Sequence, residues 1–309
     1  MESKDYYVES ENGNIIRCNL RGKFKKQFEL KKDKQYILDV AVVGDFVDIE
    51  MNEDGTGSIH FIHERKNCIS RKAPRIKGAA FRGERLEQKI ASNVDDMIIV
   101  TSAVLPMFNN KALDRLIVIA ESSHINPIIV INKIDLVKDE LDYWAELYTQ
   151  IGYKVFVTSV VTGQGIKELA EEIKGKVNVF WGASGVGKSS LLNKLFPELD
   201  LRVGEISSSS KKGTHTTVTV LLKKVAEDTY IVDTPGIREI EPYGIKKEDL
   251  AHYLKEFSLY LNDCRFNTCT HFHEPGCAVI DAVENELISL ERYESYLNML
   301  DTIEEDINF

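Results

Sequence analysis

The sequence predicts three regions: an all-β barrel, an α/β domain built on a parallel sheet, and a helical C-terminal region. Short alternating strands fill residues 1–70, strands alternate with amphipathic helices over residues 94–238, and no strand pattern remains in residues 239–309. Strands separated by helices are typical of parallel sheets, and closely spaced short strands are typical of barrels. Residues 71–93 are predicted to be a basic connector between the first two regions.

The N-terminal region alternates apolar and polar residues, as at Ile16, Cys18 and Leu20. This is the period of a half-buried strand. Asn12-Gly13 and Asp54-Gly55 suit hairpin turns because both dipeptides tolerate positive φ. About five such strands predict a small barrel, and their basic loops favour an oligonucleotide-binding (OB) barrel.

Charge is distributed unevenly along a chain whose net charge is −10. Eight basic and two acidic residues lie between Arg17 and Lys34, and nine basic and two acidic residues lie between Arg65 and Lys89. The last 29 residues instead hold nine acids and one arginine. The N-terminal third is therefore the candidate polyanion-binding face, because clustered basic residues attract polyanions. OB strands that carry basic loops favour RNA as that polyanion. The candidates for stacking on bases, about two of them exposed, are Tyr6, Tyr7, Phe24 and Phe28.

The central region predicts six strands with crossover helices. The strands are expected at residues 97–100, 128–131, 154–158, 177–181, 218–222 and 230–233. Helical spacing of apolar residues covers 113–120, 141–151 and 166–173, and then 250–261 and 283–300 in the C-terminal region. The central region should therefore fold as a doubly wound α/β domain.

A glycine-rich segment follows the apolar strand VNVFW and precedes the helical run SSLLNKLF. Its residues are Gly182, Ala183, Ser184, Gly185, Val186, Gly187, Lys188, Ser189 and Ser190. This is the context of a phosphate-binding P-loop, in which backbone N–H groups and a helix N-terminus surround the phosphates. Lys188 is expected to reach the β- and γ-phosphates, and Ser189 to ligate Mg²⁺.

The segment Asn132-Lys133-Ile134-Asp135 follows the strand PIIVI. A carboxylate at Asp135 can accept hydrogen bonds from N1–H and the 2-amino group of guanine, donors that adenine does not offer there. The stem of Lys133 is expected to pack on the base, and Thr158 and Ser159 to form a further guanine loop. Helix capping is the alternative role for such an Asn and Asp, because both residues are common at that position.

Two further segments are typical of nucleotide-dependent switches. The segment Asp233-Thr-Pro-Gly236 begins at the last residue of the strand TYIVD. Asp233 is expected to interact with Mg²⁺ indirectly, without being one of its direct ligands, and the N–H of Gly236 is expected to bond the γ-phosphate. In the polar segment 204–217, Thr216 or Thr217 is expected to coordinate Mg²⁺. His215 is the candidate for orienting the attacking water, because Ile237 stands where Ras-like enzymes carry a glutamine. A solvent-exposed, inactive histidine is the alternative for His215.

These segments occur in an unusual order. Ras-like GTPases place the P-loop first, whereas here the Asn-Lys-x-Asp segment precedes it. The sequence therefore predicts a circularly permuted P-loop GTPase domain, a rearrangement that requires only neighbouring termini at the surface. The Asp-x-x-Gly switch then leads directly into the C-terminal region.

Four potential metal ligands lie close together in the C-terminal region: Cys264, Cys269, His271 and Cys277. Three cysteines and a histidine at this spacing are typical of a closed, structural zinc site. His273 is a competing fourth ligand, and a set of buried free cysteines is the alternative. Zinc would stabilise a helical region that lacks a large core.

The combination resembles the bacterial GTPases that depend on the small ribosomal subunit, the RsgA family. The resemblance rests on Val43-Gly44-Asp45, Asn-Lys-Ile-Asp, the P-loop, Gly213-x-His-Thr-Thr, Asp-Thr-Pro-Gly-Ile-Arg-Glu and the cysteine segment. It implies GTP bound by residues 132–135 and 182–190, a catalytic His215, zinc on the Cys₃His set, and magnesium with GTP. It also implies rRNA binding and late maturation of the small subunit, which stimulates hydrolysis. Lys212 departs from the family's usual arginine and keeps the charge without its planar contact.

The remaining expectations concern location and rival functions. No apolar run approaches the ~20 residues of a membrane span, and the start shows no secretory signal, so a cytoplasmic location is expected. A monomer is also expected. A P-loop ATPase or small-molecule kinase is the rival enzyme, and the carboxylate of Asp135 argues against it. An RNA-binding scaffold that uses GTP only as a conformational ligand is the rival without catalysis.

Overall fold

The computed structural model describes residues 5–22, 40–72, 87–137, 142–201, 221–233 and 244–303. The chain divides into two compact units, Met1–Asn93 and Val94–Phe309. The range predicted as a basic connector belongs to the first unit. The α/β and C-terminal regions share the second.

The N-terminal unit is built from strands, as predicted. Four of them form one sheet in the order β1-β2-β4-β3: β1 (Tyr6–Glu9), β2 (Ile15–Leu20), β3 (Val47–Met51) and β4 (Gly57–Ile62). The hairpins β1–β2 and β3–β4 are antiparallel and contain the two predicted glycine turns, whereas β2 and β4 pair in parallel. Cys18 of β2 and Ile59 of β4 are buried.

One strand does not join that sheet. β5 (Cys68–Lys72) pairs antiparallel with β6 (Glu87–Ser92) in a separate two-stranded sheet. Within the described residues the first 70 positions therefore supply four strands to the main sheet, where about five were predicted. The partner of β5 lies beyond residue 86, and pairing over such a distance leaves no trace in a local pattern.

The second unit contains a six-stranded sheet in the order β11-β12-β10-β7-β8-β9. The strands are β7 (Asp96–Ser102), β8 (Asn126–Asn132), β9 (Lys154–Thr158), β10 (Val177–Trp181), β11 (Leu221–Ala226) and β12 (Thr229–Asp233). All neighbouring pairs are parallel except β11–β12. The sheet confirms the predicted α/β domain.

Strand β11 corrects the prediction for residues 218–222. It begins at Leu221 within the described residues and runs antiparallel to β12. Only Glu227 and Asp228 separate the two strands, and a crossover to a parallel strand needs a dozen or more residues. The short link therefore makes a hairpin at the edge of the sheet.

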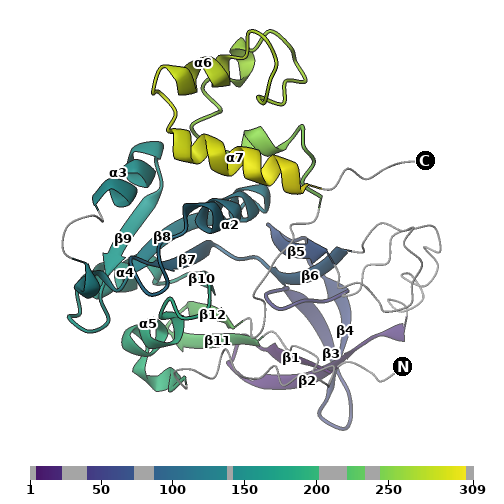
Figure 1. Ribbon diagram of the computed structural model, residues 1–309. Coiled ribbons are helices and arrows are strands. Elements are labelled where there is room, and N and C mark those ends of the chain that lie inside the picture. The colour runs from purple at the N-terminus through teal and green to yellow at the C-terminus, as the bar shows by residue number, and fades with distance from the viewer. Residues whose placement is uncertain are drawn as a thin grey trace, which may run out of the picture. The chain divides into compact units, whose positions relative to one another are not determined.

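Helices cover both faces of this sheet (Figure 1). On one face α4 (Ile166–Ile173) and α5 (Lys188–Leu195) pack their apolar residues on Ile98, Val100 and Ile128. On the other face α2 (Asn110–Ser122) packs on β7 and β8, and α3 (Asp142–Ile151) packs beside β9. Two 3₁₀ helices, η1 (Ile134–Leu136) and η2 (Pro197–Leu199), lie in the connections.

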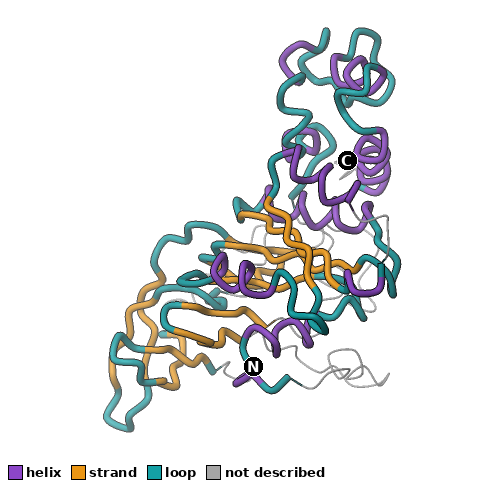
Figure 2. The backbone as a smooth tube through the Cα atoms, turned by 90° about the vertical axis from the view of Figure 1, so that its left-hand side faces the viewer, coloured by secondary structure: helices purple, strands orange, loops and turns teal. Residues whose placement is uncertain are grey.

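The C-terminal region holds helices and loops and, in its described part, no strand (Figure 2). Its elements are η4 (Leu250–Tyr253), η5 (Leu261–Asp263), α6 (Ala278–Glu284) and α7 (Leu290–Thr302). Residues 250–261, predicted to be helical, form successive turns with i to i+3 hydrogen bonds, such as Tyr260 N–H to Phe257 O. Apolar residues spaced three and four apart are compatible with both α-helical and 3₁₀ turns, so this pattern does not distinguish the two.

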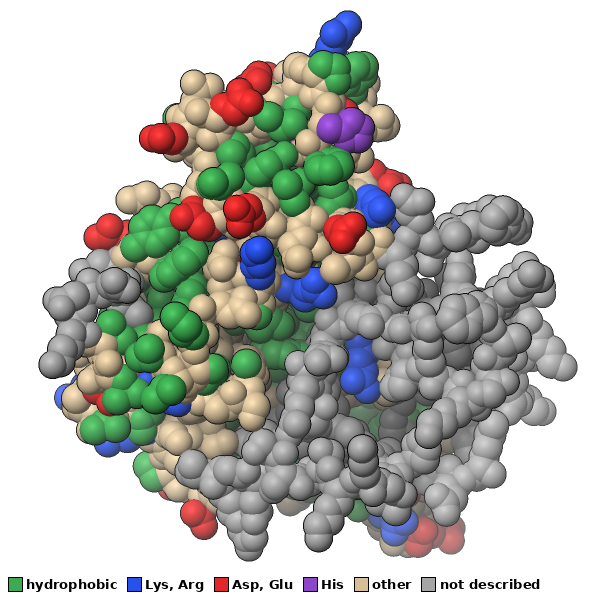
Figure 3. All heavy atoms as spheres, viewed as in Figure 1, with side chains coloured by type: hydrophobic (Ala, Val, Ile, Leu, Met, Phe, Trp, Pro, Cys, Tyr) green, Lys and Arg blue, Asp and Glu red, His purple; other side chains and the backbone are tan. Residues whose placement is uncertain are grey.

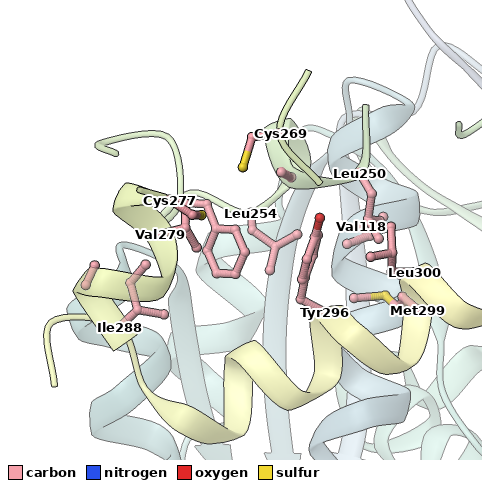
Figure 4. Packing of buried hydrophobic residues seen from close by; sticks show 13 residues of the cluster. Val118, Leu250, Leu254, Cys269, Cys277, Val279, Ile288, Tyr296, Met299 and Leu300 are labelled. Atoms are coloured by element: carbon pink, nitrogen blue, oxygen red, sulfur yellow. The ribbon is translucent and has the colours of Figure 1, made fainter. Parts of the chain in front are cut away.

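A hydrophobic core joins this region to α2 (Figure 4). Leu250 and Leu254 pack with Tyr296 and Met299 of α7 and with Val118 of α2. Each fully buried side chain of this size contributes about 1.5–3 kcal/mol to folding. The zinc-ligand candidates Cys269 and Cys277 lie in the same cluster. The C-terminal region therefore completes its core with a helix of the α/β domain.

None of the described helices is long and apolar enough to cross a membrane. Exposed apolar side chains of the C-terminal region include Leu259, Phe272 and Leu287, and hydrophobic side chains are visible on the face of this region that Figure 3 presents.

Candidate nucleotide and zinc sites

The carboxyl ends of the parallel strands bring the predicted nucleotide-binding segments to one edge of the sheet. The P-loop follows β10, the segment from Asn132 to Asp135 begins at the end of β8, and Ser159 follows β9. Asp233 ends β12, the neighbour of β10. In open α/β sheets this edge is where ligands bind.

Two glycines allow the P-loop to approach the neighbouring strands closely. A Cβ atom on Gly182 would lie 2.0 Å from the carbonyl oxygen of Val100, and one on Gly187 would lie 2.5 Å from Nδ2 of Asn132. Both residues have positive φ, at 150° and 97°. Neither position therefore accepts a side chain. Helix α5 begins directly after Gly187, so its first N–H groups face the loop, as an anion site requires.

Lys188 lies over the P-loop. Its Nζ donates hydrogen bonds to the carbonyl oxygens of Gly182 (2.6 Å) and Ala183 (2.8 Å). Ala183, Ser184 and Gly185 are exposed, and the buried side chain of Val186 anchors the loop in the core. The loop thus presents an ammonium group and exposed backbone, which suits a phosphate chain.

Asn132 connects three of the predicted segments. Its side chain is buried, and Nδ2 donates to the carbonyl oxygen of Val186 in the P-loop (3.0 Å). Its Oδ1 accepts a hydrogen bond from the hydroxyl of Thr158 (3.2 Å). Asn132 and Thr158 therefore hold the segment from Asn132 to Asp135, here named the base-recognition segment after its predicted role, against the P-loop rather than facing solvent.

Asp135 and Ser159 form the polar pair expected for guanine recognition. The Ser159 hydroxyl donates to Oδ1 of Asp135 at 2.6 Å. Asp135 is exposed at the start of η1, whereas Ser159 is buried. The serine fixes the direction of the carboxylate, whose remaining acceptor capacity is open to a ligand.

Lys133 bridges two loops. It has a left-handed backbone, with φ of 65°. Its Nζ donates to the carbonyl oxygens of Gly185 (2.6 Å) and Leu105 (2.5 Å). The second acceptor lies in residues 103–109, here named the β7–α2 loop, which carried no motif in the sequence. Ile134, the next residue, begins η1 and is half-buried.

Several predicted site residues lie outside the described part of the chain. His215, Thr216, Thr217, Gly236 and Ile237 belong to undescribed segments, and Asp233 is described by its backbone alone. Ser189 and Ser190 lie in the first turn of α5, and both are half-buried.

The ligand atoms of the Cys₃His cluster lie close enough together to bind one zinc ion. The ligand atoms of Cys264, Cys269, His271 and Cys277 all lie within 4.8 Å of one another. Nδ1 of His271 is 3.3 Å from Sγ of Cys277 and 3.5 Å from Sγ of Cys264, and those two sulfurs are 3.9 Å apart. Zinc bonds of ordinary length place tetrahedral ligand atoms about 3.4–3.8 Å apart. These donors fit structural zinc.

Hydrogen bonds from outside the cluster hold its loop. Glu274 accepts from the backbone N–H and hydroxyl of Thr270 (2.9 and 2.5 Å). The hydroxyls of Tyr293 and Tyr296 on α7 donate to the carbonyl oxygens of His271 (2.8 Å) and Thr270 (2.6 Å). No motif in the sequence points to these three residues, although a Glu between metal ligands is a usable signal.

Burial distinguishes His271 from His273, the two candidates for the fourth zinc ligand. His271 is 4% exposed and points Nδ1 at the cysteines, whereas His273 is exposed and lies outside the cluster. Burial lowers the pKa of His271, which keeps its ring neutral, the form that binds a metal. His271 is therefore the fourth ligand candidate.

Two family models match the chain. The model of the RsgA N-terminal domain matches residues 3–59, and that of the RsgA GTPase matches residues 62–242, more than half of the chain. The chain belongs to the RsgA GTPase family. Members of this family hydrolyse GTP, and magnesium accompanies the nucleotide in such GTPases.

Curated RsgA proteins are similar over almost the whole chain. The small ribosomal subunit biogenesis GTPase RsgA of Bacteroides fragilis (strain YCH46) is 38% identical over 304 residues, which cover 97% of this chain and 94% of the relative. The protein of the same name from Geobacillus sp. (strain WCH70) is 40% identical over 304 residues, with the same coverage.

Solved structures agree with the fold. The crystal structure of YjeQ from Thermotoga maritima has a TM-score of 0.77 and 36% identity, and the match covers 97% of this chain and 94% of that one. The structure of YloQ, described as a circularly permuted GTPase, has a TM-score of 0.69 and 31% identity, with 97% and 91% covered. The order of segments along this chain is that permutation: the strands β7, β8 and β9 precede the P-loop strand β10.

Proposed function

We propose that this RsgA family member hydrolyses GTP during late maturation of the small ribosomal subunit. In this proposal it binds ribosomal RNA, the subunit stimulates hydrolysis, and hydrolysis releases the protein. The names of its curated relatives support the role in subunit biogenesis. The proposal places a monomer in the cytoplasm, where ribosomal subunits are assembled.

The hydrogen bond from Ser159 to Asp135 is the main support for guanine as the base. Asn132, in the same segment as Asp135, binds the P-loop. A carboxylate held in this way accepts two N–H donors from guanine and finds none on adenine. A site built around such hydrogen bonds rejects a base that lacks them by about 10⁴-fold. This argues against the ATPase and small-molecule kinase alternatives.

The P-loop residues 182–190 are proposed to bind the phosphates, with Lys188 turning from its carbonyl partners to the β- and γ-phosphates. Ser189 and Thr217 are the proposed magnesium ligands, and that ion neutralises phosphate charge when bound. Thr216 is the alternative magnesium ligand to Thr217, Asp233 is proposed to interact with that ion indirectly, and the N–H of Gly236 to bond the γ-phosphate. His215 is proposed to orient the attacking water, because Ile237 offers no polar atom for that task.

Features of the N-terminal unit support RNA binding. Tyr7 is 70% exposed and pairs across β1 and β2 with Arg17, which is also exposed. An exposed aromatic ring beside a guanidinium suits base stacking and phosphate contact. Tyr6 is half-buried, and Phe24 and Phe28 lie outside the described residues. Tyr7 is therefore the stacking candidate that the described residues favour.

The test is phosphate release from GTP and from ATP, measured with and without purified small ribosomal subunits. We expect turnover of GTP alone, with a large increase on adding the subunit. Binding of GTP without turnover under either condition would instead favour the RNA-binding scaffold. Equal turnover of ATP would overturn the role given to Asp135. Light scattering of the purified protein tests the monomer.

A further inference from the structure

A buried arginine connects the C-terminal region to two helices of the α/β domain. Arg292 of α7 is fully buried, and its guanidinium donates to both carboxylate oxygens of Glu256 (2.6 and 3.2 Å) and to Oδ1 of Asp114 on α2. Asp114 also accepts from the hydroxyl of Tyr148 on α3 (2.6 Å). Removing one partner of such a buried ion pair is strongly destabilising, because it leaves the other charge uncompensated. The relative placement of α7, α2 and α3 is thus set at Arg292.

The same helix also holds the start of α2. Nδ2 of Asn110, the first residue of α2, donates to the hydroxyl of Ser295 (3.2 Å) and lies 3.4 Å from the carbonyl oxygen of Glu291, both on α7. Asn109 caps α2 by accepting from the N–H of Ala112. The β7–α2 loop ends at these residues, so α7 determines where that loop ends.

The β7–α2 loop in turn contacts the base-recognition segment. The carbonyl oxygen of Leu105 accepts from Nζ of Lys133 (2.5 Å), and Leu105 has a left-handed backbone with φ of 56°. Residues other than glycine keep this conformation where their surroundings hold them in it. Phe108 of the same loop stacks on Trp144, which stacks on Tyr148, the partner of Asp114. Two sets of contacts therefore run from α7 to the loop: one from Arg292 through Asp114, Tyr148 and Trp144 to Phe108, and one from Glu291 and Ser295 to Asn110.

We infer that Arg292 is a positioning residue for guanine recognition: by fixing Asp114 and α2 it holds the Leu105 carbonyl that orients Lys133. The inference rests on the proposed function only in requiring that this site binds guanine nucleotides. It gives the zinc-binding region an effect on nucleotide affinity through α2, separate from the Asp-x-x-Gly switch. Linkage requires the converse, that nucleotide binding alters how firmly α7 is held.

A double-mutant cycle tests this inference, because residues that act through one another are not additive. The affinity of the zinc-loaded full chain for fluorescent GDP is measured for the wild type, Arg292→Met, Lys133→Ala and the double variant. We expect Arg292→Met to weaken GDP binding about fivefold or more. On the Lys133→Ala background the same change should have less than about a twofold effect. Equal effects on both backgrounds would overturn the inference.

Arg115→Ala is the matched control, because it breaks another contact between α2 and α7, the hydrogen bond to the Thr302 hydroxyl (3.1 Å), away from the loop. It should leave GDP affinity within about twofold. Zinc content and circular dichroism show whether each variant folds. If Arg292→Met does not fold, Asp114→Asn, which removes the charge that Arg292 pairs with on α2, replaces it in the cycle, and an additive result overturns the inference there too. A wild-type protein that binds no GDP would refute the proposed function instead.

Discussion

Replacing Asp135 by asparagine removes the carboxylate proposed to recognise guanine and changes little else. Asp135 is exposed, and among the described residues its hydrogen bond is the one that Ser159 donates. The asparagine oxygen can still accept from Ser159, so folding should be unaffected. The change thus isolates ligand recognition from stability.

The expected loss follows from the hydrogen bonds that guanine would make. Two N–H donors bind the carboxylate, and hydrogen bonds to charged groups contribute about 1.5–3 kcal/mol each. Because Asp135 is exposed and asparagine keeps one acceptor, we take the lower value of about 1.5 kcal/mol for each hydrogen bond. The expected loss of binding free energy for the two bonds is then about 3 kcal/mol. At 1.4 kcal/mol per factor of ten this corresponds to roughly 100-fold weaker GDP binding.

Fluorescent GDP and xanthosine diphosphate, titrated separately, provide the assay. The asparagine amide can donate to the 2-oxo group of xanthine, so Asp135→Asn should bind the xanthine nucleotide better than the wild type does. Ser159→Ala, which loses only the orienting hydrogen bond of about 1 kcal/mol, should weaken GDP binding by about fivefold. Unchanged GDP affinity of Asp135→Asn would refute the assignment of this segment to the base.

Four further changes test other parts of the molecule. Gly187→Ala should abolish nucleotide binding and lower the free energy of unfolding, measured by chemical denaturation, by about 1–3 kcal/mol, because the new Cβ would clash with Asn132. Gly152→Ala is the control: it is also at positive φ, but no atom lies within 4 Å of its Cβ, so nucleotide binding should be unchanged. His271→Ala should release zinc in a colorimetric chelator assay and lower the thermal midpoint, whereas His273→Ala should retain zinc. His215→Ala should lower subunit-stimulated kcat by about 100-fold or more with little change in GTP affinity, and an unchanged kcat would leave it without a catalytic role. Tyr7→Ala should weaken binding to small-subunit RNA by about tenfold, whereas Tyr7→Phe should not.

The candidate phosphate-binding and zinc-binding segments can be recognised in the sequence because each is a local property of the chain. A glycine-rich turn between an apolar strand and a helix has few other uses, and the zinc-ligand candidates fall within residues 264–277. The alternation of strands with helices likewise predicted the α/β sheet, because a parallel sheet requires crossovers. The order of the segments was enough to predict the permutation.

The contacts between distant segments could be seen only in the folded chain. Arg292 is the single basic residue of an acidic C-terminal stretch and looks like a surface charge, yet it is buried against Asp114, 178 positions away. The bond from Lys133 to the Leu105 carbonyl involves a backbone atom, which no side-chain pattern reveals. The pairing of β5 with β6 and the 3₁₀ turns of residues 250–261 were also decided by packing. Residue patterns record local conformational preference, whereas which partner reaches a given group depends on the whole tertiary arrangement.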